Sequence, residues 1–352
     1  MLLVIFFMVS TLFIPQSAFS HDYEVLFPYT LGKDALEYQS AANFDSEFRT
    51  FLADGEVESV GTESTTYDRS LISHIRLLSN FPVVDRLALR VVMSAAATVR
   101  KVEGAEQPRI IKEESYYDLK PRVELTFTTQ NALEVFVGIN YRLVGSYDSV
   151  TESIDLVTTE RFGSASMNYP HFGFVKRAGA FSGGFYFQQG AEKARSVSKS
   201  NDRESIIISI EDRIQDPTTL GIFAKSKVGK FDVFAEFSAI QAGEGGNKTD
   251  DGASVEEDYI RLHFSALMPT PFVDLKGTFI YKSLSYADSR NVSLRTIPQM
   301  GIHLESILEL GGLELNAGIV GGYGTDGQSI DEFNANYKII SFGGSAGVKI
   351  SF

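Results

Sequence analysis

Strict alternation of apolar and polar residues over long stretches is the feature that most constrains how this chain can fold. Between Arg86 and Arg100 every odd position is apolar, whereas Arg90, Ser94 and Thr98 fall on even positions. A period of two places the two sets of side chains on opposite faces of a β-strand. At about 3.3 Å per residue such a strand is roughly 50 Å long, whereas globular strands usually have about 5–6 residues. The segment therefore predicts an unusually long strand with two unlike faces.

The same alternation recurs to the end of the chain, and it predicts about fourteen strands with a range of roughly 12–16. Short connections rich in Gly, Pro and Asn alternate with longer, mostly acidic ones. The short ones are Asn80–Pro82, Thr129–Asn131, Arg177–Gly179, Gly229–Lys230, Pro269–Pro271 and Gly311–Gly312. This rhythm is typical of an all-β fold, a transmembrane antiparallel up-and-down barrel with turns on one side and loops on the other. The even count places both termini on the periplasmic side. The run Asn201–Gln215 is either an external hairpin extension or an extra strand pair.

Composition excludes several classes of protein. The chain has no Cys, which removes disulfide scaffolds, cysteine nucleophiles and zinc-thiolate sites. Its net charge of −13 argues against nucleic acid as a partner, because phosphate binding needs a positive field. The chain also has no Trp, so Tyr and Phe must form any interfacial aromatic belt.

The N-terminus predicts export. Leu2–Ile14 is a mostly apolar run too short to span a bilayer, and small residues at Ala18 and Ser20 suit a cleavage site, although no Lys or Arg precedes the run. Residues 1–20 are therefore predicted to be a signal peptide. Residues 21–44 are predicted to be a periplasmic segment or a plug inside the barrel, with Asp34 capping a short helix from Ala35 to Ala42.

The C-terminus carries the most specific pattern. Phe352 is the last residue, and Ile350, Val348 and Phe342 precede it on the same face of a strand. With the signal peptide and the strand rhythm, this end resembles that of Gram-negative outer-membrane β-barrel proteins of the porin-like kind, without pointing to a subfamily. The resemblance covers residues 45–352. It implies location in the outer membrane, contact with membrane lipid and lipopolysaccharide, and a terminal signal read by the barrel-assembly machinery.

The polar face of the strands predicts a charged pore wall. Thirteen basic and nine acidic residues fall on that face, although the whole chain is acidic. The residues expected to line the pore are Arg86, Arg90, Arg122, Arg142, Glu124, Glu134, Arg261, Lys276 and Arg295. Arg86, Arg90, Arg122 and Arg142 could form a basic constriction that favours anions, or they could pair with carboxylates and hold the shape of the barrel.

These features predict a porin-like channel for passive diffusion of small polar solutes, with anion preference left open. Two alternatives remain. One is a non-transporting surface protein that binds partners through its acidic loops. The other is a barrel that carries hydrophobic small molecules, because fatty-acid-transport barrels also have fourteen strands and an N-terminal hatch.

Catalysis and metal binding are not expected from the sequence. His74, His263 and His303 fall on the inward face, but no serine and acid accompany them in the pattern that a hydrolase needs. The loop Asn247–Asp258 resembles a calcium loop only weakly, since it lacks the usual residues at several positions. No cofactor motif is present, and the oligomeric state stays open.

Overall fold

The computed structural model describes residues 31–37, 44–60, 65–104, 111–153, 156–201, 208–248, 254–288, 293–330 and 333–351. The predicted signal peptide, residues 1–20, lies outside these ranges. Within them, no helix is long and apolar enough to cross a membrane.

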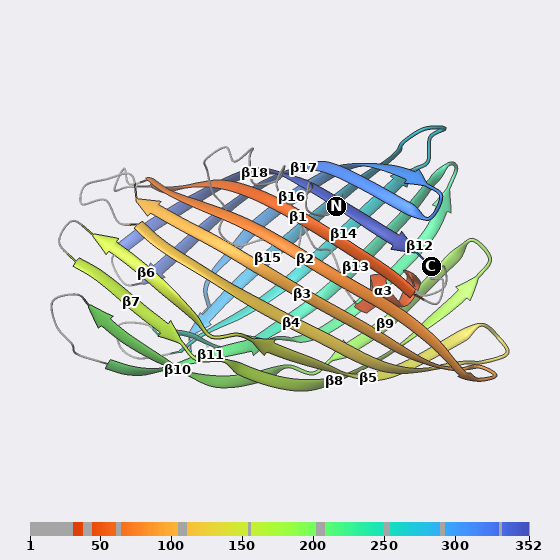
Figure 1. Cartoon of the computed structure of the whole chain (residues 1–352), viewed down its shortest axis with the longest axis horizontal. Helices are drawn as coiled ribbons and strands as arrows, with labels where there is room; N and C mark the ends of the chain where they lie inside the picture. The colour runs from red at the N-terminus through yellow and green to blue at the C-terminus, as the bar shows by residue number, and fades with distance from the viewer. Residues whose placement is uncertain are drawn as a thin grey trace, which may run out of the picture.

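Fourteen long antiparallel strands form a closed barrel (Figure 1). These strands are β1 (Phe44–Val60), β2 (Thr65–Val84), β3 (Leu87–Gly104), β4 (Ile111–Thr128), β5 (Leu133–Val144), β8 (Ala165–Ala178), β9 (Phe181–Gln188), β12 (Thr218–Val228), β13 (Phe231–Lys248), β14 (Ser254–Met268), β15 (Asp274–Asp288), β16 (Ser293–Leu310), β17 (Leu313–Ile330) and β18 (Phe333–Ser351). Because β1 pairs with both β2 and β18, the sheet closes on itself. The predicted all-β antiparallel barrel and the count of fourteen strands are confirmed.

Four further strands extend the barrel beyond one end. They are β6 (Tyr147–Ser153), β7 (Leu156–Phe162), β10 (Ala191–Asn201) and β11 (Ile208–Asp216). β6 and β7 form a hairpin between β5 and β8, β10 and β11 form a second hairpin between β9 and β12, and β10 pairs with β7. The described part of the predicted Asn201–Gln215 run, Asn201 in β10 and residues 208–215 in β11, thus belongs to an extension rather than to an additional pair of barrel strands.

The opposite end of the barrel carries short turns, and we call it the turn end. Turns at residues 85–86, 179–180, 229–230 and 311–312, with slightly longer connections at 129–132 and 269–273, join the strands there. The start of β1 and the end of β18 meet at the same end, where Asp45 pairs with Ser351. Gly179, Gly229 and Gly311 have positive φ, which glycine adopts at no steric cost.

One predicted turn is wrong. Asn80–Pro82 continues β2, with Asn80 opposite Arg90 and Pro82 opposite Ala88. The chain reverses at Asp85 and Arg86, where Arg86 has a φ of 68°. Arg86 therefore lies in an exposed turn instead of on the pore wall.

The two faces of the strands differ as the alternation predicts. The outer face exposes apolar side chains such as Val137 and Ile139 on β5, Phe172 on β8 and Ile302 on β16. The inner face buries polar ones, which is the distribution expected when lipid lies outside the barrel and protein or water lies inside.

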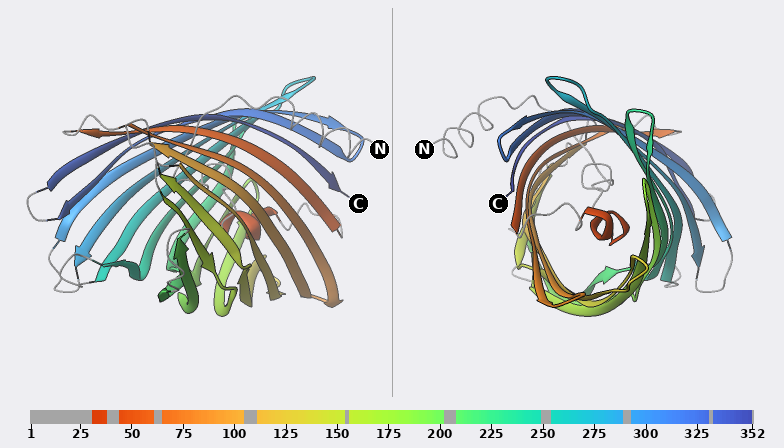
Figure 2. Two further views of the ribbon diagram at one scale, coloured as in Figure 1. Left: turned by 60° about the vertical axis from the view of Figure 1, so that its left-hand side comes forward. Right: turned by 90° about the vertical axis from the view of Figure 1, so that its right-hand side faces the viewer.

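A single described helix, α3 (Leu31–Glu37), lies inside the barrel (Figure 2). It begins before the predicted start at Ala35, and Asp34 falls within its first turn instead of at the cap. Residues 31–37, which belong to the predicted segment 21–44, lie in the lumen (Figure 2), and Phe44 begins β1.

Candidate functional site: a plugged lumen with two cavities

One side of α3 makes an apolar contact with the inner wall. Leu31, Ala35 and Leu36 of the helix form a buried cluster with wall side chains from five strands. The wall residues are Phe136 on β5, Val175 on β8, Tyr186 on β9, Phe223 on β12 and Phe234 on β13. Burying such side chains contributes about 1.5–3 kcal/mol each, so this cluster holds α3 against one side of the lumen.

Glycines on neighbouring strands make room for the aromatic rings of this cluster. A Cβ at Gly173 would lie 2.9 Å from Cε2 of Phe136, and a Cβ at Gly221 would lie 2.7 Å from the hydroxyl oxygen of Tyr186. Both distances are shorter than real Cβ atoms allow. The rings can lie flat on the wall only because these positions lack a side chain.

The other side of α3 is tied to the wall by charge. The Asp34 carboxylate, 2% exposed, accepts a hydrogen bond from Arg76 of β2 at 2.5 Å and from Arg122 of β4 at 2.6 Å. Arg177 of β8 also donates to the main-chain oxygen of Ala35 at 3.0 Å. Apolar packing and ion pairs thus fix opposite sides of the same short helix.

The arginines of the predicted constriction are all paired with carboxylates, and Arg86 in its turn pairs with the neighbouring Asp85 at 3.6 Å. Arg90 is 2.6 Å from Glu134, which Arg177 also approaches at 3.1 Å. Arg122 contacts Glu124 at 2.7 Å as well as Asp34. Arg142 contacts Asp118 at 2.8 Å and Asp216 at 3.3 Å. The arrangement agrees with the second of the two possibilities that the sequence left open, in which these arginines pair with carboxylates and hold the shape of the barrel.

The remaining predicted wall residues divide between the two cavities described below. Arg261 is buried, donates to Glu236 at 3.2 Å, and lines the central cavity. Lys276 contacts Glu305 at 2.6 Å and lines the mouth cavity. The Arg295 side chain lies outside the described residues.

The predicted assembly signal lies on β18. Phe342 is exposed on the outer face, and Val348 and Ile350 share that face in partly buried positions. Phe352 lies outside the described residues. The role of this segment in assembly stays a prediction.

The buried histidines find serine partners that the sequence did not indicate. His74 lies 2.7 Å from Ser94 of β3, and His303 lies 2.8 Å from Ser345 of β18. These partners lie on other strands, so the register between strands brings them together. Spacing along the sequence does not show that register.

The central cavity, of about 240 Å³, lies beside α3 on the side away from the turn end. Four tyrosines line it, together with five apolar residues, six charged residues and four neutral polar ones. The tyrosines are Tyr141, Tyr169, Tyr186 and Tyr259; the apolar residues are Leu31, Val92, Pro121, Pro217 and Ile240; the charged ones are Asp34, Arg76, Lys120, Arg122, Asp216 and Arg261. Apolar and aromatic residues thus make up about half of the described lining, and charged or polar residues make up the rest. Such a mixed wall suits a small amphiphilic molecule, with an apolar body and a polar group.

The central cavity also reaches the barrel wall between β4 and β5. The ladder pairs Leu119 with Leu143 and Arg122 with Asn140, but Lys120 and Pro121 have no partner on β5 between these pairs. Proline has no N–H to donate, which accounts for an interruption at this point. Pro121 and the exposed Tyr141 both occupy outward positions of their strands, yet both line the cavity.

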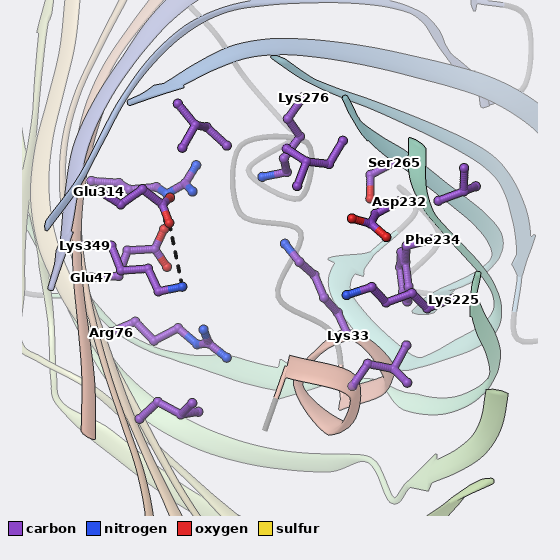
Figure 3. Close-up of a pocket in the computed structure, with 16 residues that line it drawn as sticks. Lys33, Glu47, Arg76, Lys225, Asp232, Phe234, Ser265, Lys276, Glu314 and Lys349 are labelled. Atoms are coloured by element: carbon purple, nitrogen blue, oxygen red, sulfur yellow. Dashed lines mark hydrogen bonds and ion pairs between the residues drawn. The ribbon is translucent and has the colours of Figure 1, made fainter. Parts of the chain in front are cut away.

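The mouth cavity, of about 280 Å³, lies on the other side of α3, near the turn end (Figure 3). Lys33 and Leu36 of α3 line it, whereas Leu31 and Asp34 line the central cavity, so the helix lies between the two cavities. Arg76 lines both. Lys225 of β12, Lys276 of β15 and Lys349 of β18 extend into it from the wall. Asp34 and Lys33, neighbours in sequence, thus face different cavities.

The chain shares its fold with solved channel proteins but not their sequences. A Pseudomonas aeruginosa FadL homologue superimposes with a TM-score of 0.62 at 8% identity, over 88% of this chain and 90% of that one. The Pseudomonas putida toluene transporter TodX gives 0.54 at 8%, over 96% and 95%, and the CymD monoaromatic hydrocarbon channel gives 0.56 at 9%, over 96% and 95%. No protein-family model and no curated protein sequence matches the chain. The barrel architecture is therefore that of these channels.

Proposed function

We propose that this chain is an outer-membrane channel for small hydrophobic or amphiphilic molecules, the alternative that the sequence left beside porin-like diffusion. Support comes from the fold shared with channels named for toluene and other monoaromatic hydrocarbons. Porin-like passage of polar solutes is less favoured, because α3 and its ion pairs with Arg76 and Arg122 occupy part of the lumen. In this proposal residues 1–20 direct export, and the turn end faces the periplasm.

The observation that carries the proposal is that the central cavity reaches the wall at Pro121 and Tyr141, where the β4–β5 ladder is interrupted. A molecule bound among the four tyrosines lies beside a stretch where β4 and β5 are not hydrogen-bonded. An apolar molecule gains about 25 cal/mol for each Å² of surface removed from water, so a route from the cavity into the membrane avoids the cost of passing through water. A polar solute would gain nothing from such a route.

The first test is uptake by whole cells, because lipopolysaccharide is the barrier that such a channel must overcome. We expect a Gram-negative host that expresses the chain to take up labelled toluene several-fold faster than the same host with an empty vector. In parallel, liposomes that contain the purified protein should not swell in arabinose. Porin-like swelling together with unchanged toluene uptake would overturn the proposal.

A cavity-filling variant tests whether the central cavity is the route. Ile240 is buried and lines the cavity, whereas its neighbour Ala239 is exposed on the outer face. We expect Ile240→Trp to slow toluene uptake at least fivefold and Ala239→Trp to leave it unchanged. Equal uptake by the two variants at equal folded amounts would place the route elsewhere.

An engineered disulfide tests the lateral opening. Pro121 and Tyr141 are opposite one another across the interrupted part of the β4–β5 ladder, and the chain has no native Cys. The double variant Pro121→Cys/Tyr141→Cys should lose toluene uptake when oxidised and regain it on reduction. The matched pair Val123→Cys/Ile139→Cys, on the paired part of the same ladder, should be insensitive to redox state. Insensitivity of both variants would argue against a lateral route.

A further inference from the structure

Four lysines from four separate elements converge on the mouth cavity. Lys33 comes from α3, Lys225 from β12, Lys276 from β15 and Lys349 from β18. Figure 3 shows their ammonium groups directed into the same space. In a chain with a net charge of −13, this is a local concentration of positive charge that the sequence does not bring together.

The charge at this cavity is unbalanced on its lining surface. Among the described lining residues six are basic and three are acidic, namely Glu47, Asp232 and Glu314. Two further carboxylates stand behind this surface: Glu305 pairs with Arg49 and Lys276, and Asp34 pairs with Arg76. These carboxylates hold the arginines in the wall. Lys276 is 2.6 Å from Glu305 and Lys349 is 3.8 Å from Glu314. The ammonium groups of the four lysines nevertheless point into the cavity, where a ligand would meet them (Figure 3).

Converging ammonium groups repel one another, and the repulsion grows where protein replaces water. A ligand with several negative charges removes this repulsion and adds charge-assisted hydrogen bonds. Lysine suits phosphate and carboxylate groups because its ammonium is a compact charge with three donors on a flexible stem. At about 280 Å³ the cavity is at the small end of the range for ligand sites.

We propose that the mouth cavity binds a small free anion that carries two or more phosphate or carboxylate groups. Lys33, Lys225, Lys276 and Lys349 are its ligand-binding residues. Because Lys33 belongs to α3, the bound anion links the plug helix to β12, β15 and β18. The site lies across α3 from the central cavity, so it stands independently of the proposed hydrophobic route.

Calorimetry tests this site directly. The full chain in a non-ionic detergent is titrated at low ionic strength with inorganic pyrophosphate in one experiment and with citrate in another. We expect at least one of them to bind with a Kd below about 1 mM, and the arm that binds identifies the ligand as a phosphate or a carboxylate compound. Affinity should fall as NaCl is raised from 50 to 500 mM, because salt screens charge. No binding by either anion would overturn the proposal.

Substitutions then test the residues. Lys33→Gln and Lys225→Gln should each weaken binding about tenfold, as expected for the loss of one charge-assisted contact. The control is Lys230→Gln, which makes the same charge change in the exposed 229–230 turn of the same end. Heat-modifiable migration on gels confirms that each variant is a folded barrel. Equal affinity in Lys33→Gln, Lys225→Gln and Lys230→Gln would show that the anion does not use this cavity.

Hydrogen exchange tests the link to the plug. Adding the anion that binds should slow amide exchange in residues 31–37 of the unmodified chain and should have no such effect in Lys33→Gln. Unchanged exchange in the unmodified chain at saturating anion would remove α3 from the site.

Discussion

The carboxylate of Asp34 on the plug helix lies 2.6 Å from the guanidinium of Arg122 on β4, and the same carboxylate also meets Arg76 on β2. Arg122 in turn contacts Glu124. One carboxylate on a seven-residue helix therefore joins two strands of the wall that are separated by β3. A helix this short is not stable by itself in water, so these contacts and the apolar cluster keep it folded.

Removing the charge of Asp34 should release the helix. Breaking a buried ion pair by changing one partner costs about 3–5 kcal/mol, because the other charges stay buried. We expect Asp34→Asn to raise amide exchange in residues 31–37 by more than about a hundredfold, while the barrel strands stay protected. The control Asp85→Asn, an exposed carboxylate in the β2–β3 turn, should change nothing. Unaltered exchange in Asp34→Asn would mean that apolar packing alone holds α3.

The variant Gly221→Ala, which adds one methyl group to the inner wall, should lower the free energy of unfolding of the barrel. The new Cβ would collide with the Tyr186 ring, whose hydroxyl donates to Glu236 at 2.8 Å. Overpacking of this kind costs about 1–3 kcal/mol. The control Gly277→Ala meets only Leu304 at 3.6 Å, an ordinary contact, and should change the free energy of unfolding by less than about 0.5 kcal/mol. Guanidinium unfolding in lipid vesicles measures the free energy of unfolding of the two variants. Equal values for Gly221→Ala and Gly277→Ala would show that the Tyr186 ring can move at little cost.

The cost of placing an arginine on the outer face of β16 should depend on how deep that position lies in the membrane. Ile302 is half exposed near the middle of β16, so Ile302→Arg should lower the free energy of unfolding in vesicles by about 2–4 kcal/mol. Ser306 shares the outer face but is closer to the turn end, and Ser306→Arg should cost about 0–1 kcal/mol. The reverse order of costs would contradict the placement of the membrane around this barrel.

The hairpin extension offers a pH test outside the barrel wall. Arg161 on β7 donates two hydrogen bonds to Asp148 on β6, and these bonds hold the pKa of that carboxyl below its ordinary value. Because the pKa is lowered in the folded chain, the stabilisation from this pair is present at neutral pH and is lost as the pH falls through the lowered pKa. The pair is exposed, so its contribution to stability is small. NMR titration should show the lowered pKa, and Arg161→Gln should return it to the ordinary value, whereas Lys199→Gln should not.

The repeating alternation carried most of the information about the fold. Side chains such as Val137 and Ile139 are exposed, and Glu134 and Asn140 on the same strand are buried, as their positions predict. Each residue of a two-faced strand indicates, by being apolar or polar, which face it belongs to. A few exceptions at single positions therefore do not change the pattern. The strand count was predictable for the same reason.

Local turn signals were less reliable than the alternation. Asn80–Pro82 has the residues of a turn, yet it pairs with β3 inside a long strand, and the reversal occurs five residues later at Asp85 and Arg86. Pairing with β3 overrides the local preference, because Pro82 lies close to the end of the ladder, where a missing N–H costs little. This shift is also why Arg86 was expected on the wall and is found in the turn.

The amino-acid sequence by itself determined the barrel, because a period of two sorts each strand into a lipid face and an inner face without reference to distant residues. It also placed Arg90, Arg122 and Arg142 on the inner face. Only the tertiary structure decided what these groups do. The ion pairs of Asp34 with Arg76 and Arg122, the gap in the ladder at Pro121 and the four lysines around one cavity each join elements far apart in the chain, and such proximity follows from closure of the barrel around α3.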